Sequence, residues 1–128
     1  MIRMASKIGD KVQSADWKNE KHVPAITVQD SAKAGELIKI NVRVGKEIPH
    51  PNTVEHHIRW IQVYYTPDDG KFTYDLGRAT FNSHGEGPIA TDSNADLYFT
   101  ANASGTINAV SLCNLHGLWE SSIKITVS

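Results

Sequence analysis

The sequence predicts an all-β protein, an immunoglobulin-like antiparallel β-sandwich of about seven strands. Apolar residues recur with a period of two in several separate runs, which is the pattern of half-buried strands. Turn residues such as Gly, Pro, Asn and Asp separate these runs at a spacing typical of a sandwich. Helical periodicity extends to no more than one turn, near residues 14–17, so the pattern argues against a helical fold.

The clearest strand signal lies at residues 37–44, where every second residue is Ile or Val and polar residues alternate with them. Runs that alternate, or that are rich in small and β-branched residues, predict the other strands at residues 25–28, 58–65, 72–81, 97–101, 106–113 and 123–127. The runs at 58–65 and 72–81 flank Thr66-Pro67-Asp68-Asp69-Gly70. We therefore expect these two strands to pair antiparallel across a hairpin loop.

Length and charge limit the classes of protein to consider. The 128 residues fit one domain over residues 1–128. The 13 basic and 14 acidic residues form no basic block, so nucleic acid is not an expected partner. The chain has neither a signal-peptide run nor an apolar stretch long enough to cross a membrane. We therefore expect a cytoplasmic protein with no membrane partner, and a single unpaired cysteine fits that reducing compartment.

The only cysteine, Cys113, lies three positions before His116. A lone cysteine cannot form an internal disulfide or a four-thiolate zinc site. A thiolate next to an imidazole is a donor pair that suits a redox transition metal. The pair predicts a mononuclear metal centre.

The histidines strengthen this prediction because five of the six fall in three segments that interrupt the strand pattern, at residues 20–24, 50–57 and 113–119. Taken alone, any one of them is more easily explained as a surface or capping residue. His84 lies apart from the three segments and is interpreted in that ordinary way. His56 and His57 point to opposite faces if they continue a strand, so only one of them can reach the metal. Alternation does not decide which.

The three segments, taken in order and spacing, resemble the superoxide reductases, the neelaredoxin and desulfoferrodoxin group. The matching residues are Glu20-Lys21-His22-Val23-Pro24, then His50-Pro51-Asn52 with Glu55-His56-His57-Ile58, and Cys113-Asn114-Leu115-His116-Gly117-Leu118-Trp119. The resemblance covers nearly the whole chain. It points to the one-iron class, since the chain has no cysteine before Cys113 to build the additional four-cysteine iron domain of desulfoferrodoxins.

The resemblance implies an enzyme that reduces superoxide by one electron to hydrogen peroxide, without dismutation to O2. One Fe(II)/Fe(III) ion per chain would be bound by four equatorial histidines and one axial thiolate. By motif position these ligands are His22, His50, His56, His116 and Cys113. His57 is then the member of its pair that does not bind the metal.

The resemblance also implies roles for Glu20 and Lys21, which precede the first histidine. Glu20 corresponds to a sixth ligand of the oxidised iron, and Lys21 to a cation that attracts superoxide. Without the adjacent His22, the two residues would be interpreted as an ordinary solvated pair. A chain with one iron needs an external electron donor, which in this family is commonly a rubredoxin, and one-iron relatives are often homotetramers.

Residues around the expected ligands receive weaker predictions. Backbone amides near Leu115 and His116 are expected to donate to the Cys113 sulfur, and Asn114 to fix the loop. Trp17 and Trp119 are interpreted as core residues rather than as shields of the site.

Two other functional classes compete with the enzyme. A cupredoxin-like electron carrier also places a cysteine and histidines on a β-sandwich, but it uses two histidines and usually a downstream methionine. The methionines here are Met1 and Met4, so that interpretation lacks its axial ligand and leaves two histidines unexplained. The second class is a non-catalytic sandwich that binds metal for stability or recognises a partner protein, with no exchangeable coordination position.

Overall fold

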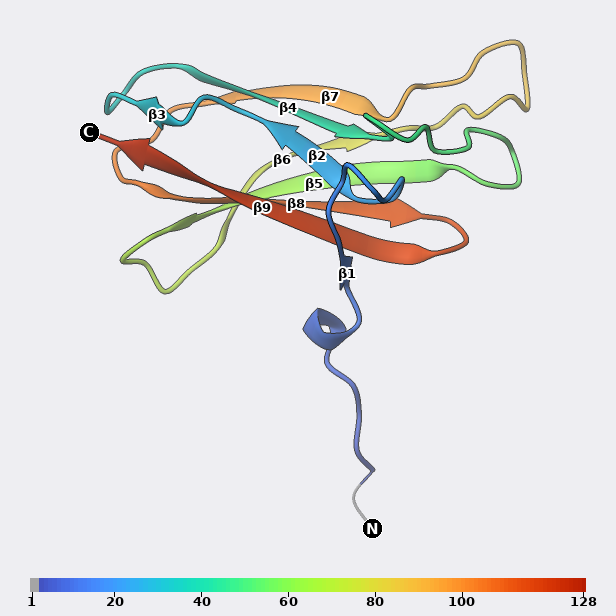
Figure 1. The fold of residues 1–128 in the computed structure, drawn as a ribbon, viewed down its shortest axis with the longest axis horizontal. Coiled ribbons are helices and arrows are strands. Elements are labelled where there is room, and N and C mark those ends of the chain that lie inside the picture. The colour runs from blue at the N-terminus through green and yellow to red at the C-terminus, as the bar shows by residue number, and fades with distance from the viewer. Residues whose placement is uncertain (1–2) are drawn as a thin grey trace.

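The protein is a two-layer β-sandwich, which confirms the predicted fold class (Figure 1). The computed structural model describes residues 3–128, so residues 1–2 of the single domain expected over 1–128 lie outside the described part. The larger sheet has the order β1-β9-β8-β5-β6 with β3 also paired to β9, and the smaller sheet has the order β2-β4-β7. The elements are η1 (Ile8–Asp10, a 3-10 helix), β1 (Gln13–Ser14), β2 (Pro24–Thr27), β3 (Ser31–Ala32), β4 (Ile38–Val44), β5 (Ile58–Pro67), β6 (Tyr74–Thr80), β7 (Asn94–Phe99), β8 (Gly105–Cys113) and β9 (Gly117–Val127).

Each of the seven predicted strands corresponds to a strand of the structure, and β5 and β6 pair antiparallel as expected. Two further strands, β1 and β3, have two residues each and pair parallel to β9, so the pairing is not purely antiparallel. Residues 14–17, where the sequence pattern allowed at most one helical turn, form no helix. Ser14 belongs to β1, and the chain turns slightly later, where the Asn19 amide donates to the Asp16 carbonyl at 2.9 Å.

The core is formed by alternate residues of β4, β5 and β8, which face one another between the two sheets. Ile40, Ile61 and Ile107 are each at most 1% exposed. Cys113 ends the inward-facing row of β8 and is itself 1% exposed. Because close-packed interiors leave little freedom to a side chain, the core fixes the position of this thiol.

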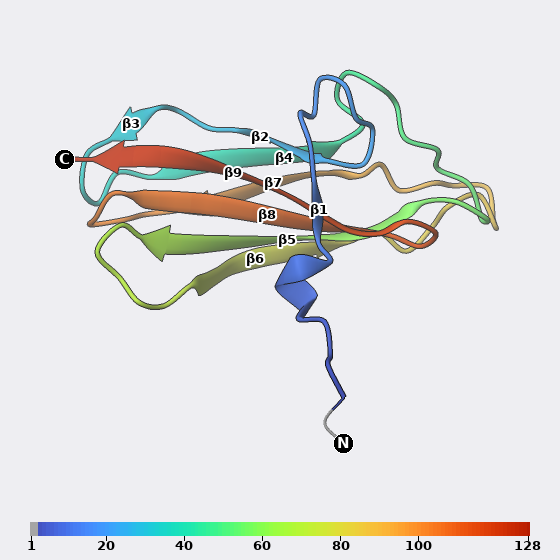
Figure 2. The ribbon, with the colours of Figure 1, turned by 60° about the horizontal axis from the view of Figure 1, so that its bottom comes forward.

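The β4–β5 loop and the β8–β9 turn lie at the same end of the sandwich, opposite the C-terminus (Figure 2). The segment that precedes β1 projects away from both sheets, and its residues 3–11 are exposed. Within residues 3–128, no helix is long and apolar enough to cross a membrane.

Candidate metal centre

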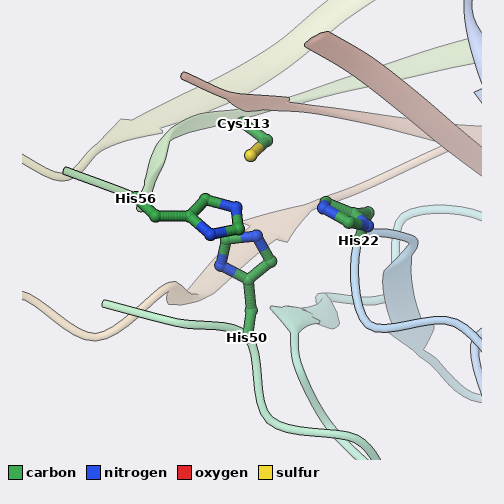
Figure 3. A group of neighbouring side chains, drawn as sticks. All are labelled: His22, His50, His56 and Cys113. Carbon is green, nitrogen blue, oxygen red and sulfur yellow. The ribbon is translucent and has the colours of Figure 1, made fainter. Parts of the chain in front are cut away.

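Three histidines and the cysteine converge at the loop end of the sandwich (Figure 3). One nitrogen from each of His22, His50 and His56, together with the Cys113 sulfur, lie within 4.8 Å of one another. His22 precedes β2, His50 and His56 lie in the β4–β5 loop, and Cys113 is the last residue of β8. The sandwich thus brings together residues that are far apart in the sequence.

His116 completes the group. Its Nδ1 lies 3.2 Å from His22 Nε2 and 3.7 Å from Cys113 Sγ. The four imidazoles form a closed ring in the order His22, His50, His56, His116, with neighbouring ring centroids 4.9, 4.6, 5.0 and 4.9 Å apart. His22 and His56 face each other across this ring at 6.2 Å. The structure therefore places all five residues predicted as ligands next to one another, with His116 exposed to solvent.

The chemistry of these side chains suits a metal ion. The Nε2 atoms of His50 and His56 are buried without a hydrogen-bond partner in the described residues. Burial is the main cause that lowers the pKa of His50 to about 4, although its hydrogen bond to the Pro51 carbonyl opposes the shift. Burial also lowers the pKa of His56, followed by the charge of His116. Neutral imidazoles with free lone pairs are metal ligands, and a bound cation would satisfy nitrogens that are otherwise costly to bury.

The β8–β9 turn carries Cys113 and His116 and is tied to the segment before β5. Gly117 has a φ of +80°, the left-handed conformation expected for a glycine after this turn. The Asn114 side chain accepts from the His57 amide at 2.9 Å and donates to the Glu55 carbonyl at 2.9 Å, which agrees with its predicted role in fixing the loop. The predicted amide bonds to the Cys113 sulfur are wrong, since in residues 3–128 the hydrogen-bonding contact of that sulfur is with the ring of His116.

Glu20 lies against the outer edge of His22. Its Oε1 accepts from His22 Nδ1 at 2.6 Å and from the His22 amide at 2.8 Å. Partial burial raises the pKa of Glu20, but the hydrogen bonds and charge of His22 outweigh it and leave the pKa below its ordinary value. A carboxylate on Nδ1 holds the imidazole with Nε2 toward the cluster, as in the carboxylate–histidine–metal arrangement of many metal sites.

Lys21 is partly buried beside the cluster. Its positive charge contributes to the lowered pKa of both His50 and His56. In the part of the chain that the structure describes, Lys21 forms no ion pair. The ammonium group is therefore available to a small anion that approaches the cluster.

Two residues that hold His22 were not predicted in these roles. Ser111 is fully buried, and its hydroxyl donates to the His22 carbonyl at 3.1 Å. Trp119 stacks on the His22 ring at 4.8 Å, and it is only partly buried, so its interpretation as a core residue is wrong. Trp17 is also not in the core, since it is partly exposed with the Lys46 ammonium 5.1 Å from its ring. For Ser111 the signal was present, because it is a polar residue in the inward-facing row of β8.

Three imidazoles and one thiolate at the loop end of a β-sandwich form a cluster that could hold a metal ion. A sequence profile described as Desulfoferrodoxin matches residues 14–122, and the chain belongs to this family.

Individual relatives agree with this membership. A superoxide reductase from Pyrococcus abyssi is 48% identical over 116 residues, which cover 91% of this chain and 96% of the relative. The crystal structure of a Thermotoga maritima protein has a TM-score of 0.94 at 48% identity, covering 97% of this chain and 99% of that one. The superoxide reductase (neelaredoxin) of Archaeoglobus fulgidus in the reduced form has a TM-score of 0.83 at 45% identity, covering 91% and 98%.

The cupredoxin alternative finds no support in these results. Of the two methionines, Met4 is 94% exposed in the projecting N-terminal segment, and Met1 lies outside the described residues. The family found is Desulfoferrodoxin, and the cluster has twice the histidines of a blue-copper site.

Proposed function

We propose that this protein is a superoxide reductase that reduces superoxide by one electron to hydrogen peroxide, without dismutation to O2, with one Fe(II)/Fe(III) ion per chain. The observation that supports this most is the convergence of three imidazole nitrogens and the Cys113 sulfur within 4.8 Å. Membership of the Desulfoferrodoxin family and the similarity to the superoxide reductase of Pyrococcus abyssi support the same reaction.

The donor set fits iron. Imidazole nitrogens are good ligands of Fe(II), and a single thiolate adds a soft donor. The ion would be held by His22, His50, His56, His116 and Cys113. When bound there, iron supplies the electron that superoxide accepts, and the thiolate increases the electron density on the metal. Burial lowers the pKa of His50 and His56, which favours their neutral, metal-binding form, and the core holds the Cys113 sulfur in a fixed position.

Lys21 is proposed to attract the substrate. Superoxide is a small anion, and a cation beside a shallow site raises its local concentration and its rate of encounter. The absence of an ion pair at Lys21 within residues 3–128 supports this role, because the ammonium group is not in direct contact with a carboxylate, although its charge does act on the nearby Glu20.

Glu20 is proposed to have two positions. In the first, its carboxylate accepts from His22 Nδ1 and orients that ring, as in the structure. In the second, the carboxylate binds the oxidised iron, as the family resemblance implies. Glu20 lies on the Nδ1 side of the His22 ring and the cluster lies on the Nε2 side, so a move of Glu20 to the metal would remove the hydrogen-bond acceptor behind His22.

The remaining proposals concern the surroundings of the reaction. The single cysteine cannot hold a second iron, so an external donor, proposed to be a rubredoxin, supplies the electron. A homotetramer and a cytoplasmic location are proposed from the family resemblance and from the unpaired thiol. One continuous core, with members from β4, β5 and β8, supports a single domain.

The test is the metal content and the absorption spectrum of the purified protein. We expect one iron per chain and a visible thiolate-to-Fe(III) band after oxidation with ferricyanide, which superoxide also generates from the reduced protein. Stoichiometric copper, or iron that superoxide does not oxidise, would contradict the proposal. In the same spectra, Glu20→Ala should shift the band of the oxidised protein while leaving superoxide reduction largely intact, and an unchanged band would argue against ligation by Glu20.

A further inference from the structure

The β4–β5 loop turns back on itself directly after β4, so that two residues five positions apart come into contact. Gly45 follows the last residue of β4, and His50 is the first predicted metal ligand in the loop. A Cβ atom added at Gly45 would lie 2.8 Å from the backbone nitrogen of His50 and 3.5 Å from its Cβ. The absence of a side chain at Gly45 therefore allows the His50 backbone to lie against the end of β4.

Gly45 also has a φ of +88°, a conformation that residues with a side chain rarely adopt. The turn and the close approach are thus two separate reasons for a glycine at this position. Gly35, which lies between β3 and β4, separates them. Its φ is +82°, but a Cβ atom added there would meet no atom within 4 Å.

An added side chain at Gly45 would have to displace either the end of β4 or the loop, and the end of β4 is held firmly. Val44 is 3% exposed and belongs to the hydrophobic core. Its amide donates to the Ser93 carbonyl and its carbonyl accepts from the Ser93 hydroxyl, both at 3.0 Å. On its other side, Val44 pairs with Pro24 of β2. Because close-packed interiors resist displacement, this side of the contact stays in place.

The loop side of the contact is free to move. Residues 46–49, which connect Gly45 to His50, are all exposed. His50 Nδ1 donates to the Pro51 carbonyl at 2.6 Å, but this bond joins neighbours in the loop and would move with them. The displacement caused by an added side chain would therefore fall on His50.

His50 points into the metal cluster from the loop (Figure 3). Its Nε2 is buried without a hydrogen-bond partner in the described residues. To reach an ordinary van der Waals separation of 3.4 Å from the added Cβ atom, the His50 nitrogen would have to retreat by at least about 0.6 Å. Metal–ligand distances keep within about 0.2 Å of their normal values. A backbone shift of this size is larger than the bond from His50 Nε2 to a metal tolerates.

We propose that Gly45 is a positioning residue of the metal centre. Its missing side chain allows the His50 backbone to lie against the fixed end of β4, and this contact places Nε2 among the other donor atoms. The inference rests on the proposed function, because it takes His50 as a ligand of the iron. Gly45 then determines metal affinity in addition to forming the turn.

The test compares Gly45→Ala with Gly35→Ala, which adds the same methyl group at a similar φ. Competition with a chelator measures the Fe(II) affinity of each apoprotein. We expect Gly45→Ala to weaken Fe(II) binding at least about tenfold, as the loss of a group that supports a metal ligand typically does. Gly35→Ala should leave this affinity unchanged, although both variants strain the backbone. Equal Fe(II) affinities of the two variants would overturn the proposal.

Urea unfolding of the two apoproteins is the accompanying measurement of stability. Both should fold, because the displacement at Gly45 is expected to fall on an exposed loop and not on the sandwich. A Gly45→Ala protein that does not fold, beside a Gly35→Ala protein that does, would also overturn the proposal. Gly45 would then support the sandwich and not the position of His50.

A second pair of variants tests whether Gly45 acts through His50. In a His50→Ala protein, the further change Gly45→Ala should lower the Fe(II) affinity by much less than tenfold, since the ligand that it displaces is already absent. A full tenfold loss in this background would contradict the assignment to His50. A wild-type protein that binds no iron would contradict the proposed function. Iron binding by the wild type and by Gly45→Ala with equal affinity would contradict only the role of Gly45.

Discussion

His56 and His57 are adjacent, have the same side chain, and lie in different chemical environments. The His56 ring belongs to the metal cluster, and its buried Nε2 has no partner in the described residues. The His57 ring is turned away, with its Nδ1 bonded to the Thr53 carbonyl and its face covered by His84. The comparison teaches that two adjacent imidazoles can have separate surroundings, and that hydrogen-bond partners decide which of them is free to bind a metal.

The largest effect is expected from Cys113→Ser, which removes a ligand on the His56 side and leaves the surroundings of His57 unchanged. Loss of an outer-shell partner of a metal ligand typically lowers metal affinity about 10–100-fold, so loss of a ligand itself should lower it at least as much. We expect the visible band of the oxidised protein to disappear and iron retention to fall by a similar factor, measured by absorption and metal analysis. An oxidised Cys113→Ser protein that keeps its visible band would show that Cys113 is not a ligand.

A smaller effect should follow from Lys21→Ala. Removing the cation beside the cluster should slow the second-order reaction with superoxide about tenfold and flatten its dependence on ionic strength. Pulse radiolysis at several salt concentrations measures both. Lys39→Ala is the matched control, because Lys39 lies on β4 and pairs with Asp96 at 3.6 Å. If both variants slow the reaction equally, net charge rather than Lys21 governs the encounter.

The smallest effect is expected from Asn114→Ala. The Asn114 side chain holds the segment that carries both His56 and His57. The two side-chain hydrogen bonds to the segment at residues 55–57 each contribute about 1 kcal/mol, so the free energy of unfolding should fall by about 2 kcal/mol. Urea unfolding measures this change, and Asn102→Ala at an exposed position is the control. Asn114 would have no fixing role if the two variants had equal stability.

Alternation of apolar residues, together with runs of small and β-branched residues, was sufficient to predict the seven longer strands, because each is long enough to carry such a pattern. It missed β1 and β3, since two residues contain no period. It also placed the start of β9 six residues too late: the structure begins this strand at Gly117, where the residues do not alternate. Pairing with β8, and not local pattern, extends β9 into that region.

The candidate site was predictable where its chemistry is unusual. A lone thiol and clustered histidines are rare enough to identify Cys113 and its partners, although choosing His56 over His57 required the family resemblance. Ser111 and Trp119, which hold His22 in place, were harder to predict because Ser and Trp occur in every kind of environment. His84 was interpreted as an ordinary surface or capping residue, and that is wrong, because it is 5% exposed and stacks on His57. No local pattern relates residues that meet only after the sheets have formed.

The tight turn between β8 and β9 has a consequence for the order in which the protein folds. Cys113 and His116 are brought together by a local hairpin, whereas His22 and His116 are separated by 94 positions in the chain. Local hairpins close quickly, and long loops close at a high entropic cost. A metal ion bound by both residues would link the hairpin to the distant His22, so its binding free energy would add to the stability of this long-range contact.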